Sequence, residues 1–174
     1  MFDISTSADF YEMLVEDFDE LITKPDSARL ALHCAISAYH LREWLWKDWL
    51  SSDTEAKEAI GVTSESSFND WIYEHCVWFG SIRDLANGTK HFRQNPNMKT
   101  SLSGGYGKGP YGVGTYGRSY LLIDYGEEAG EHQQKAAISL IEVVVRFWRD
   151  FFRLYRPDVG VKHSQNHIRE RLSP

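Results

Sequence analysis

The segment from Asp26 to Leu50 has apolar side chains along two sides of one predicted helix, and this feature constrains the fold most. Its apolar residues recur every three to four positions, which predicts a helix beginning at Asp26 or Ser27. One row comprises Ala28, Ala31, Leu32, Ala35, Ile36, Tyr39, Trp46 and Trp49, and the other Leu30, Cys34, Leu41, Trp44 and Leu45. Because a helix that is apolar on both sides has to be covered by neighbours, we expect this segment to be central to its domain.

Further segments show the same helical spacing of apolar residues. We predict long helices at residues 8–23, 67–86 and 127–155, and a short one from Asp53 to near Gly61. Hydroxyl groups at residues 5–7 can cap the first of these helices. Pro25 disfavours helical backbone at the residue before it, so it ends that helix. Asn87 and Gly88 tolerate the left-handed conformation that commonly ends a helix, so they are expected to end the third long one.

Residues 94–118 lack helical periodicity. Seven of the 13 glycines of the chain lie between positions 104 and 117, and tyrosine-glycine pairs recur there every five residues. A glycine-rich phosphate loop would lead into a helix through a lysine and a serine or threonine, whereas residues 118–123 resemble a strand. We therefore predict a hairpin or an ordered surface flap here rather than a nucleotide-binding loop.

These patterns together predict an all-α fold, an antiparallel four-helix-type bundle with a small β-hairpin or Gly/Tyr-rich flap between its third and fourth helices. The 174 residues are expected to form one domain, with a Gly/Tyr-rich insert at 94–126 and a polar C-terminal tail at 157–174. The first ten residues do not resemble a signal peptide, and no stretch approaches 18 consecutive apolar residues. We expect a cytoplasmic protein with no membrane segment.

Charge is distributed unevenly along the chain. The net charge is −6, but residues 1–75 contain sixteen acidic and five basic residues, whereas residues 76–174 contain nine acidic and fourteen basic residues. The acidic total disfavours a general nucleic-acid coat, while the basic half can still form a local site for an anion. Alternatively, the two halves attract each other, within the fold or across a dimer.

The last predicted helix carries a basic stripe, and we expect this stripe to bind an anion. Its members are Arg146, Arg149 and Arg153, followed by Arg156. The same arginines can instead stabilise the negative end of the helix dipole. They can also pair with the acidic side of the helix at residues 8–23.

Seven histidines and two cysteines suggest metal binding or nucleophilic catalysis. His33 and His40 lie two turns apart on one helix, and Glu128 and His132 have helical i, i+4 spacing. None of these spacings is a recognised metal motif, so no metal site and no cofactor is predicted. Cys34 and Cys76 fall near apolar helical faces, where a thiol stays protonated and unreactive.

The stretch RDLANGTKHF at residues 83–92 contains the densest set of chemically active groups. Arginine can hold a phosphate through two hydrogen bonds, lysine adds a point charge, and histidine can donate or accept a proton near neutral pH. These are the functional groups that a metal-independent ribonuclease needs for phosphate binding and proton transfer. Stabilisation of a helix C-terminus by basic residues accounts for the same stretch without catalysis.

The predicted catalytic set combines this stretch with the central helix. It comprises His91 as general acid or base, Arg83 and Lys90 as phosphate contacts, Asn87 as a positioning residue, and His40 and Glu43 as supporting residues.

Two segments carry a resemblance, AYHLREWLW at 38–46 and RDLANGTKH at 83–91. With the helical plan, they resemble uncharacterised bacterial helical-bundle proteins, which in turn resemble the HEPN superfamily. That resemblance implies a bundle that often dimerises and that includes RNA-cleaving toxins and defence proteins. The HEPN pattern is an arginine, often followed by a polar residue, then a histidine after four to six intervening residues. Here Asp84 follows Arg83, and seven residues separate Arg83 from His91.

We therefore predict a HEPN-like, metal-independent RNA-processing or defence protein, with RNA and a second copy of the chain as its expected partners. A non-catalytic homodimeric interaction protein is the alternative. It would use the aromatic insert and the tryptophans that end the central helix as its binding surface. A metal-binding helical bundle is the third interpretation.

Overall fold

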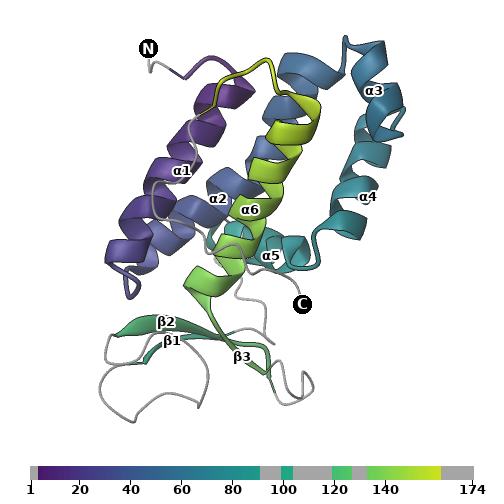
Figure 1. Ribbon diagram of the computed structural model, residues 1–174. Helices are drawn as coiled ribbons and strands as arrows, with labels where there is room; N and C mark the ends of the chain where they lie inside the picture. The colour runs from purple at the N-terminus through teal and green to yellow at the C-terminus, as the bar shows by residue number, and fades with distance from the viewer. Residues whose placement is uncertain (1–3, 91–98, 104–118, 127–132, 162–174) are drawn as a thin grey trace, which may run out of the picture.

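The computed structural model describes residues 4–90, 99–103, 119–126 and 133–161, with only the backbone at positions 89 and 90. The chain is mostly helical with one small antiparallel sheet (Figure 1). Its helices are α1 (Ser7–Thr23), α2 (Ala28–Leu45), the π-helical turn η1 (Trp46–Leu50), α3 (Thr54–Ile60), α4 (Glu65–His75), α5 (Phe79–Lys90) and α6 (Ala137–Tyr155). Its strands are β1 (Lys99–Ser103), β2 (Tyr120–Asp124) and β3 (Gln134–Ala136).

The first half of the chain folds largely as its sequence predicts. The Thr6 side chain caps α1 by accepting a hydrogen bond from the Asp9 backbone N–H, and Asp53 caps α3 in the same manner. Gly61 ends α3 in the left-handed conformation, with φ of 84°. The predicted central helix is confirmed as α2, and its last predicted turn is η1. In Figure 1, α1 and α6 lie against α2, with α3 and α4 on the far side of α6.

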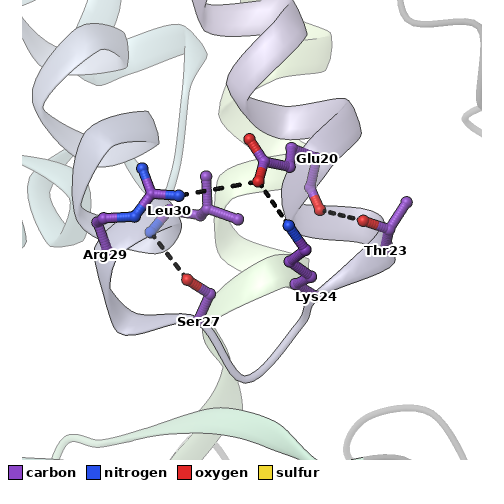
Figure 2. A network of polar contacts seen from close by, with 6 residues as sticks. All are labelled: Glu20, Thr23, Lys24, Ser27, Arg29 and Leu30. Carbon is purple, nitrogen blue, oxygen red and sulfur yellow. Dashed lines mark hydrogen bonds and ion pairs between the residues drawn. The ribbon is translucent and has the colours of Figure 1, made fainter.

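The turn between α1 and α2 is closed by a network of polar contacts (Figure 2). The Lys24 ammonium lies 2.8 Å from the Glu20 carboxylate, and the Thr23 hydroxyl donates to the Glu20 carbonyl. The Ser27 side chain accepts a hydrogen bond from the Leu30 backbone N–H and so caps α2. These short-range contacts reverse the chain direction, which lets α1 pack along α2.

The helix predicted at 67–86 is wrong, because the structure has two helices there. α4 ends at His75, Cys76 has extended backbone, and α5 begins at Phe79. Because of the break, the apolar sides of α4 and α5 are buried against different parts of the core. Phe68 of α4 packs against Trp46 and Phe151, whereas Phe79 packs against Trp148.

The predicted stop at Asn87 and Gly88 is also wrong, since α5 continues to Lys90. Both residue types tolerate helical backbone, at a cost in intrinsic propensity, so a potential C-cap pair need not end a helix.

The last helix begins later than residue 127, the start that Gly126 and the acidic residues following it predict. α6 starts at Ala137, and the residues just before it form β3. β3 forms antiparallel backbone pairs with the edge of β2 that does not face β1, with Ala136 opposite Leu122 and Gln134 opposite Asp124. Backbone pairing with β2 therefore replaces the first helical turns. Residues 127–132 lie outside the described part of the chain.

The predicted mostly helical fold with a small β element is confirmed, and the β element is a three-stranded sheet whose third strand follows the insert. β1 and β2 pair antiparallel, with Lys99 opposite Asp124 and Ser103 opposite Tyr120, and β3 completes the order β1-β2-β3. The predicted strand is confirmed as β2. Its Leu121 N–H donates to the Pro25 carbonyl at 3.0 Å, which attaches the sheet to the α1–α2 turn. The tyrosine-glycine repeats lie outside the described residues.

The centre of the core is Trp148 of α6, which is fully buried. Its rings contact Phe79, Phe147 and Phe151, and its indole N–H donates to the Ala38 carbonyl of α2 at 2.9 Å. The hydrogen bond matters because a polar group buried without a partner destabilises the fold.

Replacing this indole tests its central role. We expect Trp148→Phe to lower the free energy of unfolding by about 2–4 kcal/mol, because it leaves a cavity and removes the donor to the Ala38 carbonyl. Urea denaturation followed by circular dichroism measures the change. The half-buried Trp46 is the control, and Trp46→Phe is expected to cost less than about 1 kcal/mol. Equal losses in the two variants would contradict the central role of Trp148.

Candidate functional site

The strongest polar cluster of the described structure lies where α2 faces α4. Arg42 of α2 donates one hydrogen bond to the Asn69 side chain of α4 at 2.8 Å and another to the Glu43 carboxylate at 3.0 Å. Its guanidinium also lies 4.4 Å from the centre of the Tyr39 ring and donates to the Tyr39 hydroxyl. Only 14% of the Arg42 side chain is exposed, so Arg42 acts as an internal brace.

The braced carboxylate contacts an imidazole. His40 Nδ1 lies 3.4 Å from Glu43 Oε1, and about a third of each side chain is exposed. A carboxylate beside Nδ1 helps to orient the imidazole ring. The pair predicted as supporting residues is therefore brought together, with Glu43 held in turn by Arg42.

Arg83 lies on α5, which packs against α2. Its guanidinium is 2.9 Å from Asp84 and 5.8 Å from the centre of the Tyr73 ring. The hydrogen bond to Asp84 raises the pKa of Arg83, so this side chain stays cationic. The Arg83 side chain is nearly half exposed, but its ion pair with Asp84 reduces its attraction for an external anion.

A chain of ring contacts links Arg83 to His40. The Tyr73 ring contacts Phe79 at 5.4 Å, Phe79 contacts Tyr39 at 5.8 Å, and Tyr39 contacts His40 at 5.2 Å between centroids. Fixed aromatic neighbours restrict how far the two polar groups can move relative to each other. Within the predicted set, His40 and Glu43 are in contact, and Arg83 is linked to them through the rings of Tyr73, Phe79 and Tyr39.

Of the other members of the predicted catalytic set, only Asn87 has a described side chain. Asn87 lies on α5 and is half-buried. Lys90 is the last residue of α5, and its side chain is not among those described. His91 lies outside the described residues.

The predicted anion-binding stripe on α6 is partly occupied by its own neighbours. Arg146 forms an ion pair with Glu142, and Arg149 forms one with Asp150 at 2.8 Å. Arg153 is exposed. Two of the three arginines therefore already have a carboxylate partner on the same helix, which reduces their attraction for an external anion.

Two further histidines, His33 and His75, and both cysteines lie in the part of the chain that the structure describes. His75 stacks on Trp71 at 4.2 Å and contacts the Trp71 carbonyl at 2.7 Å, while His33 is exposed on α2. No cluster of three or more potential metal ligands occurs in the part of the chain that the structure describes. Cys34 and Cys76 are buried, and burial raises the pKa of both thiols, that of Cys76 to about 11.

The tryptophans at the end of the central helix are half-buried against the core. Trp44 stacks on Phe10 at 4.8 Å, and Trp49 contacts Phe151 while donating its indole N–H to Asp53. Among the described residues, no helix is both long and apolar enough to cross a bilayer.

Comparisons with protein-family models, with characterised proteins and with solved structures gave no match, so the site has to be interpreted from its own chemistry.

Sequence reasoning missed Tyr39, Arg42 and Asn69. Tyr39, Arg42 and Glu43 recur at helical spacing, which could have placed them on one side of α2. Asn69 is 27 positions from Arg42, and no local pattern predicts that contact.

Removing the brace should destabilise the fold more than removing an exposed arginine. We expect Arg42→Ala to cost about 1–3 kcal/mol, because Asn69 and Glu43 lose a charged donor. Thermal unfolding measures this, and Arg29→Ala is the control. Arg29 is 63% exposed and lies 3.8 Å from Glu20, so its loss should cost less than about 0.5 kcal/mol. A smaller effect at Arg42 than at Arg29 would contradict the bracing role.

Proposed function

We propose that this chain is a HEPN-like, metal-independent RNA-processing protein whose catalytic surface lies along α2 and α5. The observation that carries the proposal is the imidazole–carboxylate pair of His40 and Glu43, which Arg42 braces and a chain of aromatic rings joins to the exposed Arg83. Such a surface offers a proton acceptor and a cation on neighbouring helices.

The chemistry needs no metal. The ribose 2′-oxygen attacks the adjacent phosphorus while its proton passes to an imidazole. The bond to the 5′-oxygen then breaks, and that leaving oxygen takes a proton from a second group, which gives a 2′,3′-cyclic phosphate and a free 5′-hydroxyl. A guanidinium stabilises the charge that builds up on the phosphate oxygens.

The proposal gives each residue a role. His91 is the general acid or base, Arg83 and Lys90 contact the phosphate, and Asn87 positions them. His40, oriented by Glu43, is the second proton-transfer group. Tyr73, which is partly exposed beside Arg83, offers a ring on which an unpaired base can stack.

Cleavage of a mixed, end-labelled RNA pool in EDTA tests the proposal. We expect the wild type to produce 2′,3′-cyclic phosphate ends, and His91→Ala and His40→Ala each to reduce the rate at least about tenfold, because general acid–base groups contribute that much or more. Glu43→Gln should reduce the rate less than His40→Ala, since it alters the orientation of the imidazole and leaves it in place.

His33→Ala is the matched control, because His33 is an exposed histidine on the same helix and has no role in the proposal. It should cleave at the wild-type rate. Equal cleavage by wild type and His91→Ala, or no cleavage by the wild type, would contradict the catalytic proposal.

A further inference from the structure

A groove of about 480 Å³ runs between α4 and α6, away from the proposed catalytic surface. Its wall is mainly apolar and includes Trp71 from α4 and Phe147, Phe151 and Tyr155 from α6. Val77, in the break after α4, stands at its rim with 79% of its surface exposed. Such an apolar surface is costly to leave in water, so the groove is suited to a protein contact.

The outer side of α6 shows which kind of element fits the groove. Val143, Phe147, Asp150 and Leu154 all line it, at intervals of four, three and four residues. This stripe is separate from the core stripe of α6, which contains Trp148, and its ends are exposed, 37% for Val143 and 69% for Leu154. Intervals of four and three residues are those of a seam between two packed helices, so the occupant that fits best is a helix.

The charge of Asp150 favours a helix of another protein over a second copy of α6 as the occupant of the groove. Asp150 lies within the seam, and 61% of its side chain is exposed. Parallel pairing with a second α6 would place Asp150 opposite its own counterpart. Antiparallel pairing over the same seam would place the two carboxylates on either side of the symmetry axis, about one turn apart. Both arrangements bring like charges together, which opposes self-association through this seam.

The charged and titratable neighbours of Asp150 in the groove wall already have partners. Arg146 is in an ion pair with Glu142, and His75 is stacked on Trp71. Asp150 receives hydrogen bonds from Arg149 at one oxygen and keeps most of its surface in solvent. A cation on the incoming helix would therefore find its complement at Asp150.

We propose that the groove between α4 and α6 binds an amphipathic helix of a partner protein, with apolar residues beside Trp71 and Phe147 and a lysine or arginine facing Asp150. This interaction is separate from RNA cleavage, and neither result depends on the other.

Two synthetic helical peptides of about 18 residues, long enough for five turns, test the proposal. They have leucine at the seam positions and differ only at the central one, which is lysine in the first and glutamate in the second. Fluorescence anisotropy with the full chain measures both affinities. We expect the lysine peptide to bind at least about tenfold more tightly. Asp150→Lys should reverse this preference, while Leu154→Glu should weaken both peptides at least about tenfold.

Matched controls separate the groove from general surface effects. Leu102→Glu changes another exposed leucine, on β1, and Glu58→Lys reverses an exposed acidic charge on α3. Both should bind the peptides as the wild type does. Because Leu154 is exposed, Leu154→Glu should unfold at the wild-type temperature, which thermal unfolding verifies.

Three results would overturn the proposal. The first is equal affinity for the two peptides, or no binding of either. The second is an Asp150→Lys variant that still prefers lysine. The third is sedimentation of the wild type as a dimer that Leu154→Glu dissociates and Leu102→Glu does not, since the groove would then bind a second copy.

Discussion

The packing of Trp148 against α2 determines where the other elements can lie. Its indole reaches the Ala38 carbonyl, and the buried alanines Ala31, Ala35 and Ala38 leave space for such close approach. α6 is thereby held along α2. The apolar sides of α4 and α5, before and after Cys76, have to pack on α2 and α6 from different directions. The break between α4 and α5 follows from that requirement. The break places α4 along one wall of the groove. It places α5, which carries Arg83, at the proposed catalytic surface.

Local signals in the sequence predict the parts of the fold that local chemistry determines. Thr6 and Asp53 cap the starts of α1 and α3, and Gly61 ends α3, all through contacts with residues a few positions away, so these residue types are sufficient evidence. The break at Cys76 and the pairing of β3 with β2 arise from contacts between distant segments. The apolar period continues through Cys76, so periodicity alone predicts one helix there. Gly126 and the acidic residues after it resemble a helix start, but they do not show that Gln134–Ala136 pairs with β2.

In the candidate site, too, some contacts follow from local sequence and others depend on tertiary packing. His40 and Glu43 are three residues apart on one helix, which brings their side chains together and made the pair predictable. The brace from Arg42 to Asn69 joins α2 to α4, and the ring contacts that reach Arg83 join α2 to α5 through Phe79. These connections depend on the tertiary packing that Trp148 organises. The ion pairs of Arg146 with Glu142 and of Arg149 with Asp150 are also local on α6, so their spacing in the sequence could have indicated them.

α4 connects the two surfaces. Asn69 points toward Arg42, whereas Trp71, two positions later and therefore about 200° around the helix, lines the groove. An 11-residue helix is too short to be stable alone in water. Its position therefore depends on tertiary contacts, through Phe68 and Ile72 in the core and Asn69 at the brace. A change that displaces α4 alters the groove and the orientation of Glu43 together, although the two surfaces use different residues and different chemistry.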